Sequence, residues 1–146
     1  MPTLYLIRGL PGSGKSYLAA AMADGLGNAG IVVEADQFFL SSNGHTETYR
    51  FDRRFLGAAH DEAYGRTMRY LREGKSVMVA NTFSTNRELS RYITGVERCG
   101  LKVQVQVIKC IGQYNSIHNV PRRAIEKMRD RWEDFDGETV FNGDIG

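Results

Sequence analysis

The sequence has few cysteines and no long hydrophobic run, and both shortages narrow what the chain can be. Its two cysteines, Cys99 and Cys110, are too few for a disulfide framework and do not have CxxC spacing. We expect both to be free thiols of a cytoplasmic protein, because disulfides persist mainly in oxidising compartments. No run approaches the about 18 apolar residues of a membrane helix, and no charged leader precedes an apolar stretch, so we expect neither a membrane anchor nor an export signal.

A large charge of one sign is also missing. The net charge of +2 argues against a protein that binds nucleic acid through its overall charge. Most of the 19 basic residues are nevertheless arginines, whose guanidinium groups suit phosphate contacts. The end of the chain, from Glu133 onward, contains acidic residues and no basic residue. The length of 146 residues predicts one domain, and we place it at residues 1–135 with a loose acidic tail at residues 136–146.

Apolar runs alternate with helical patterns along the chain and predict a three-layer α/β fold. Strands are predicted at residues 3–8, 30–36, 76–80 and 101–107, and helices at residues 15–25, 52–73, 86–100 and 121–133, with a loop over residues 38–50. Strands joined by helices of this length form a mostly parallel sheet of four to five strands with helices on both faces. The polar and apolar alternation of the fourth strand predicts a position at the sheet edge.

The most specific motif is a glycine-rich loop directly after the first predicted strand. The pattern G-x-x-x-x-G-K-[ST] is matched from Gly9 to Ser16, between a predicted strand and a predicted helix. Backbone N–H groups of such loops hold phosphates, the lysine reaches the β and γ phosphates, and the hydroxyl binds Mg²⁺. The motif predicts a P-loop NTPase fold that binds ATP or GTP. The expected nucleotide-binding residues are Gly9, Pro11, Gly12, Ser13, Gly14, Lys15, Ser16 and Tyr17.

A second candidate position is Asp36, which we identify as the only acid at the carboxyl end of a predicted strand, where parallel sheets bind their ligands. Beside the P-loop strand, its carboxylate can take the proton of an acceptor hydroxyl, or hold Mg²⁺ through water together with Ser16. A helix or turn cap is the structural alternative. The third strand ends in Ala80-Asn81, without the acidic pair of a motor ATPase.

A basic lid is predicted at the last helix. Residues 114–123 are polar and lead into a charged helix, where Arg122 and Arg123 are candidates to act with Lys15 and Asp36 in catalysis. A solvated helix face is the alternative for both arginines. Two further groups flank the expected acceptor cleft and can contact a nucleic acid strand or else pack on the core or face solvent: Phe38, Phe39, Tyr49 and Phe51, and Arg50, Arg53 and Arg54.

Several motifs, in this order, resemble one family. They are GLPGSGKS from Gly9, ADQFF from Ala35, YRFD from Tyr49, NTF from Asn81, HNVP from His118 and RWE from Arg131. The series resembles the AAA-type ATP-binding kinase-like domains related to bacteriophage polynucleotide 5′-kinase, over about residues 3–135. The resemblance implies that Lys15 and Ser16 bind ATP and Mg²⁺, that Asp36 is the base, and that the acceptor is the 5′-hydroxyl of a nucleic acid strand. The chain departs from the family at Tyr17, Phe39 and Ala80-Asn81.

These observations predict an ATP- and Mg²⁺-dependent kinase that phosphorylates a hydroxyl group, with the 5′-end of DNA or RNA as the first expected acceptor. Two alternatives stay open. One is a kinase for a nucleoside, nucleotide or sugar. The other is a non-catalytic ATP-binding module, which the missing acids at Ala80 and Asn81 favour.

Overall fold

A parallel sheet of five strands organises the computed structural model, which describes residues 1–42, 47–114 and 120–142. The strands lie in the order β2-β5-β1-β6-β7, and every neighbouring pair is parallel. Their bounds are β1 (Thr3–Arg8), β2 (Gly30–Val33), β5 (Ser76–Ala80), β6 (Gln104–Cys110) and β7 (Thr139–Phe141). β1 lies at the centre because its apolar run can be buried on both faces: Leu4, Leu6 and Ile7 are all fully buried.

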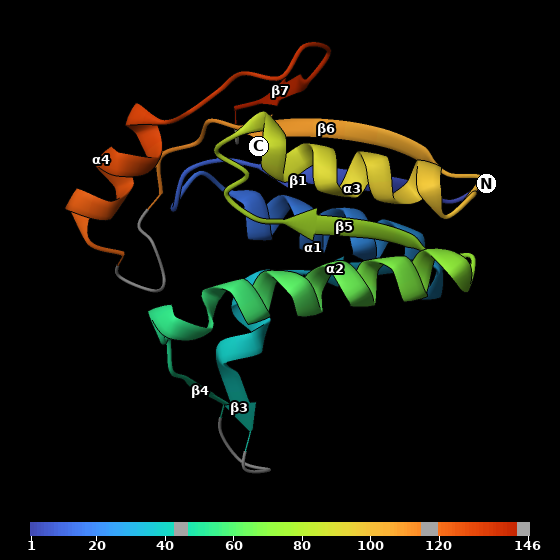
Figure 1. The fold of residues 1–146 in the computed structure, drawn as a ribbon, viewed down its shortest axis with the longest axis horizontal. Helices are drawn as coiled ribbons and strands as arrows, with labels where there is room; N and C mark the ends of the chain where they lie inside the picture. Colours follow the sequence, from blue (N-terminus) through green and yellow to red (C-terminus); the bar gives the residue numbers. More distant parts are fainter. Residues whose placement is uncertain (43–46, 115–119, 143–146) are drawn as a thin grey trace.

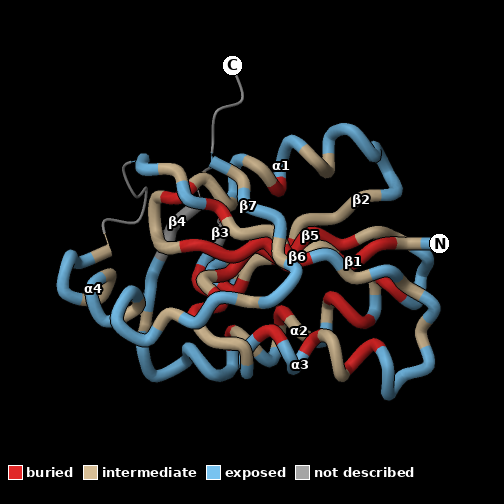
Figure 2. Tube along the Cα trace, turned by 90° about the horizontal axis from the view of Figure 1, so that it is seen from above, coloured by how far each residue is buried: buried red, intermediate tan, exposed pale blue. Residues whose placement is uncertain are grey.

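Helices cover both faces of this sheet, as Figure 2 shows with α1 on one side and α2 and α3 on the other. Their bounds are α1 (Lys15–Leu26), α2 (Leu56–Arg72) and α3 (Asn86–Arg98). The alternation of β1 divides the core in two. Leu4 and Leu6 pack in the larger cluster with residues of α2 and α3, while Ile7 packs with Ala19 of α1. The predicted three-layer α/β fold is confirmed.

The remaining elements gather near the carboxyl ends of the strands (Figure 1). They are a 3₁₀ turn at Ala35–Phe39, the hairpin of β3 (Leu40–Ser42) and β4 (Glu47–Tyr49), a 3₁₀ turn at Arg53–Phe55, and α4 (Arg122–Asp130). α4 buries none of its residues. No helix in the described ranges is long and apolar enough to cross a membrane.

Four expectations are wrong in detail. The fourth predicted strand begins at Gln104, and β7 pairs with its last three residues, so that β6 is not the edge strand. The second predicted strand ends at Val33, because the chain turns into the 3₁₀ turn that follows. The predicted loop at residues 38–50 contains the β3–β4 hairpin. The tail is also not loose at residues 138–141, since Glu138 makes a buried ion pair and β7 joins the sheet.

A buried arginine at the end of β1 explains why this last segment packs against the sheet. Arg8 is 0% exposed, and its Nη1 donates to Oε1 of Glu138 at 2.9 Å. Its Nε and Nη2 donate to the carbonyl oxygen of Phe83 at 3.0 and 2.6 Å, and Nη2 also donates to the carbonyl oxygen of Glu133 at 2.6 Å. The guanidinium carbon lies 4.2 Å from the ring centre of Trp132. One cation therefore joins β1, the segment after β5 and the end of the chain.

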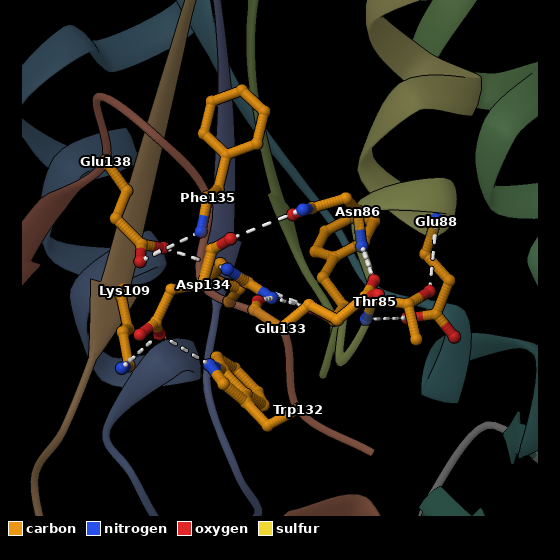
Figure 3. Close-up of polar contacts among 11 residues, drawn as sticks. Thr85, Asn86, Glu88, Lys109, Trp132, Glu133, Asp134, Phe135 and Glu138 are labelled. Carbon is orange, nitrogen blue, oxygen red and sulfur yellow. Dashed lines mark hydrogen bonds and ion pairs between the residues drawn. The ribbon is translucent and has the colours of Figure 1, made fainter.

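Residues 132–138, which we call the C-terminal anchor, are fastened by further polar contacts (Figure 3). The Glu133 carboxylate accepts from the backbone N–H of Asn86 at 2.8 Å. Asp134 accepts from Lys109 Nζ at 2.9 Å and from the indole N–H of Trp132 at 3.1 Å. Since the anchor directly follows α4, the C-terminal end of that helix is held while the helix itself lies outside the core.

Replacing Arg8 with Met should remove about 3–5 kcal/mol from the free energy of unfolding, because it leaves the Glu138 carboxylate buried without its cation. The measurement is urea unfolding followed by circular dichroism. Lys109→Met is the matched control, because it breaks an ion pair with Asp134, whose side chain is 73% exposed. We expect the control to lose less than about 1 kcal/mol. Equal losses in the two variants would show that burial of the Arg8 pair is unimportant.

Candidate functional site

A cleft of about 1320 Å³ opens at the carboxyl edge of the sheet. Among the parts of the chain that line it are the glycine-rich loop, the turn after β2, the segment after β5, and α4. They contribute Lys15, Asp36, Asn81 and Arg123 among others. The structure therefore brings together residues that are far apart in the sequence, at the edge where a parallel sheet binds its ligands.

The glycine-rich loop has a backbone that only glycines accommodate easily. Gly12 and Gly14 have φ angles of 81° and 96°, in the left-handed region. A side chain at Gly9 would collide with Oγ of Ser13 and lie 2.7 Å from the carbonyl oxygen of Cys110. Ser13 is buried, and its Oγ has no hydrogen-bond partner among the described residues. The loop is thus a tight cradle containing an unused polar atom, which fits the binding of a phosphate group.

The amino group of Lys15 lies inside this cradle. Its Nζ donates to the carbonyl oxygen of Leu10 at 3.1 Å. Burial lowers the pKa of Lys15, and the nearby acidic groups of Cys110, Glu34 and Asp36 partly oppose this shift. Burial also raises the pKa of Cys110 to about 11, so that its thiol is neutral near pH 7. A phosphate anion entering the loop would therefore stabilise the charged form of the lysine.

Ser16 is paired with an acidic residue that the sequence analysis missed. Its hydroxyl donates to Oε1 of Glu34 at 2.6 Å. Glu34 directly follows β2, so the identification of Asp36 as the only acid at a strand end is wrong. Oxygen donors of this kind are the ligands that Mg²⁺ prefers. No group of three or more His, Cys, Asp and Glu side chains that could hold a metal occurs in the described part of the chain.

Asp36 lies in the 3₁₀ turn after β2, where its side chain is exposed and lines the cleft. β5 separates β2 from the P-loop strand, so the expectation that Asp36 follows a strand beside β1 is corrected. Buried Asn81, at the end of β5, holds the turn in place: its Oδ1 accepts from the backbone N–H of Ala35 at 2.9 Å. The amide at the position where an acid is missing therefore orients the turn that carries both nearby acids.

The candidate lid residues are placed differently from one another. Arg123 lines the cleft, whereas Arg122 has a side chain that is 93% exposed, pairs with Glu126 and does not line it. Lys127 and Arg131 line the cleft as well, and Nε of Arg131 donates to the hydroxyl of Ser84 at 2.8 Å. Residues 123, 127 and 131 are spaced by four, so one basic stripe of the last helix faces the cleft. That spacing was visible in the sequence.

The aromatic and arginine candidates near the acceptor side also differ in position: some line the cleft and others do not. Phe39 is buried, and its ring centre lies 5.1 Å from that of Phe51. Phe51 is 52% exposed and lines the cleft together with Arg53. Arg54 faces solvent in an ion pair with Asp52. The side chain of Tyr49 and residues 115–119, which include His118, lie outside the described part of the chain.

The segment after β6 completes the surroundings of the loop. The backbone N–H groups of Gly112 and Tyr114 donate to the carbonyl oxygens of Ser13 and Gly12, at 3.1 and 2.6 Å. The ring of Tyr114 is exposed and would lie 3.3 Å from a side chain at Gly14. Tyr17, the last predicted nucleotide-binding residue, is also exposed and lines the cleft. No sequence motif distinguished Tyr114.

Comparisons with known proteins agree with this arrangement. Human NEDD4-binding protein 2 is 28% identical over 140 residues, which is 90% of this chain but only 8% of that protein. Kti12 of Chaetomium thermophilum, solved with ADP-AlF3, has a TM-score of 0.68 at 16% identity, covering 98% of this chain and 90% of its own. The APS kinase CysC of Mycobacterium tuberculosis, solved with AMPPNP and APS, has a TM-score of 0.64 at 13% identity, covering 99% and 90%. At these identities both structures establish the fold.

The family comparison identifies the chain more directly. The model described as "AAA domain" matches residues 4–135, which is most of the chain and includes the loop, the turn after β2 and α4. The chain belongs to this AAA domain family and has its P-loop kinase-like, nucleotide-binding fold.

Proposed function

We propose that the chain binds Mg²⁺ and ATP in the cleft and transfers the γ-phosphoryl group to a hydroxyl group, with the 5′-end of a nucleic acid strand as the first candidate acceptor. The observation that carries the proposal is that the glycine-rich loop, the Ser16–Glu34 pair, Asp36 and the basic stripe of α4 all line one cleft. Phosphoryl transfer needs these parts: a loop that holds the phosphates, oxygen ligands for the metal, a base, and a cation that faces the phosphates across the cleft.

The nucleotide phosphates are held by the loop. Backbone N–H groups around Gly12 and Gly14 and the N-terminus of α1 bind the phosphates, and Lys15 contacts the β and γ phosphates. Glu34 and Ser16 would hold Mg²⁺, which neutralises phosphate charge and aligns the γ-phosphoryl group when bound. The 2.6 Å contact between these two side chains keeps the serine hydroxyl directed at the carboxylate before any ligand arrives.

Asp36 acts as the base in this proposal. The acceptor oxygen forms a bond to the γ-phosphorus while the bond from that phosphorus to the β–γ bridging oxygen breaks, and ADP leaves with the electron pair. The acceptor proton passes to the Asp36 carboxylate. Arg123 and Lys127 face the same cleft, and a cation there would stabilise the negative charge of the transferring group.

Phe51 and Arg53 support a nucleic acid acceptor. Both line the cleft close in sequence to the start of α2, and Phe51 keeps about half of its ring surface exposed beside the buried Phe39. An exposed ring next to a guanidinium group can stack on a base and contact its phosphate. The resemblance of the motif series to polynucleotide 5′-kinase points to the same acceptor.

Two other functions each have one supporting observation. A small-molecule kinase is favoured by the fold likeness to APS kinase, solved with APS and AMPPNP. A non-catalytic ATP-binding module is favoured by Asn81, whose amide stands at the end of β5 where the related kinases commonly have an acid.

Transfer of labelled γ-phosphate from ATP to a 5′-hydroxyl oligonucleotide tests the proposal. We expect wild type to label the oligonucleotide, and Asp36→Asn to reduce kcat by about 10²–10⁴-fold, the usual contribution of a general base, with little change in ATP affinity. Lys15→Ala should lose both activity and ATP affinity. Label on a nucleoside or sugar but not on oligonucleotides would favour the small-molecule kinase. ATP binding without transfer to any acceptor would favour the module.

The metal role of Glu34 has a test that does not depend on activity. Binding of a fluorescent ATP analogue is measured with and without Mg²⁺, and Mn²⁺ binding to the complex is followed by electron paramagnetic resonance. In wild type we expect Mg²⁺ to increase the affinity for the ATP analogue. In Glu34→Gln we expect this increase to be smaller by a factor of at least about ten. Asp24→Asn, which removes an exposed acid of α1, is the control and should keep the full gain. An unchanged metal dependence in Glu34→Gln would exclude this role.

Substitution of Gly9 tests the phosphate cradle. Gly9→Ala should weaken binding of the same ATP analogue by more than about tenfold, because the added methyl group displaces Ser13 or the Cys110 carbonyl. Gly25→Ala in α1 is the matched control, since no atom lies within 4 Å of the added carbon. We expect the control to bind normally and to gain about 0.5–1 kcal/mol in the free energy of unfolding. Normal binding by a folded Gly9→Ala protein would contradict the cradle.

A further inference from the structure

A second hollow, of about 850 Å³, is lined by residues within 87–99 of α3 and its C-cap and by Tyr64 of α2, and it adjoins the cleft. Glu88 and Arg91 line both spaces, so the second one begins where the first one ends. We call it the α2–α3 groove. The two helices that form it run side by side on the same face of the sheet (Figure 1). A long ligand whose end lies in the cleft can therefore continue along this groove.

The groove has a row of positive charges. Arg87, Arg91 and Arg98 all line it and all come from α3. Their separations of four and seven residues place them on one face of the helix. From Arg91, at the mouth of the cleft, to Arg98 the rise along the helix is about 10 Å, at about 1.5 Å per residue. On α2, Nη2 of Arg72 lies 3.5 Å from Sγ of Cys99 at the far end of the groove and adds a further cation.

Arg91 is held in place at the junction of the two spaces. Its Nη2 pairs with Asp61 at 2.9 Å, and its guanidinium carbon lies 4.4 Å from the ring centre of Tyr64. Tyr64 in turn packs so closely on Gly95 that any side chain there would collide with its ring. The small residue lets the aromatic ring lie in the floor of the groove, and the ring supports the arginine.

Two acidic residues near the groove, Asp61 and Glu88, each have a partner. Asp61 is paired with Arg91. Glu88 caps α3: one of its oxygens accepts from the backbone N–H of Thr85 at 3.4 Å, while the Thr85 hydroxyl accepts from the backbone N–H of Glu88. Arg87, Arg91 and Arg98 outnumber Glu88 and Asp61, so these charges leave the groove net positive, and Ser90 and Thr94 add hydroxyl groups beside them. Arginine and hydroxyl side chains are typical of phosphate contacts.

We propose that the α2–α3 groove binds the sugar-phosphate backbone of a single-stranded nucleic acid acceptor, downstream of the 5′-hydroxyl that lies in the cleft. This proposal rests on the proposed function and adds the path of the strand. About 10 Å corresponds to roughly three stacked nucleotides, at about 3.4 Å each. The groove contacts phosphates and only one aromatic ring faces it, so recognition is independent of sequence and sensitive to salt.

The first test is the dependence of phosphoryl transfer on acceptor length. For wild type we expect kcat/KM to rise from a dinucleotide to an acceptor of about four nucleotides and then to level off. The double variant Arg87→Gln/Arg98→Gln should lose at least about tenfold of this rise while the dinucleotide is phosphorylated as before. Arg69→Gln, an exposed α2 residue outside the groove, is the charge-matched control for each single substitution. If the double variant keeps the full length dependence, the groove does not hold the strand.

The second test measures binding and separates this proposal from the proposed function. A fluorophore is attached to Cys99, which is exposed at the end of the groove, whereas Cys110 is buried. Titration with an octanucleotide should change its signal, and each groove arginine replaced should lower the slope of log affinity against log salt by about 0.7. Salt-dependent binding of the octanucleotide without phosphoryl transfer would support the groove as a binding site and refute the kinase reaction. Phosphoryl transfer without salt-dependent binding at the labelled groove would refute the proposal that the groove binds the strand. Equal binding of polyglutamate would also refute it.

Discussion

The buried guanidinium of Arg8 is the contact on which the arrangement of the cleft depends. Arg8 ends the central strand, and Gly9, the first residue of the phosphate loop, follows it directly. The same side chain holds the carbonyl oxygen of Phe83, whose φ of 47° is in the left-handed region that a phenylalanine rarely occupies. It also holds Glu133 and Glu138 at the end of the chain. A single buried cation thus fixes the phosphate loop, the segment after β5 and the C-terminal anchor relative to one another. Because this cation is buried, its charge needs a buried carboxylate as partner, and Glu138 provides it.

An amide and a carboxylate share the work at the carboxyl ends of β5 and β2. At the end of β5, where an acid is usual, Asn81 contributes an amide that binds the backbone of Ala35. The carboxylate nearest the loop serine instead comes from Glu34 at the end of β2. The two contacts are complementary, because the amide orients the turn after β2 and Glu34 lies where that turn begins.

The parts of the structure that depend on local chain geometry were predictable from the sequence, and those that depend on distant contacts were not. The loop was predictable because Gly12 and Gly14 satisfy a backbone conformation within a few residues of Lys15. Glu34 was missed because the end of β2 depends on a hydrogen bond to Asn81, far along the chain. β7 was missed for the same reason: three residues carry no periodic pattern, and their position depends on the pairing of Glu138 with Arg8. The roles of Lys15, Asp36, Arg122 and Arg123 in catalysis stay predictions.

α4 buries none of its nine residues, and the C-terminal anchor that follows it is held by Arg8. A helix this short is marginal on its own in water, so its stability as a helix is set by what its basic face contacts. Local opening of α4 therefore costs less free energy than opening of α2 or α3, whose inner faces are buried in the core.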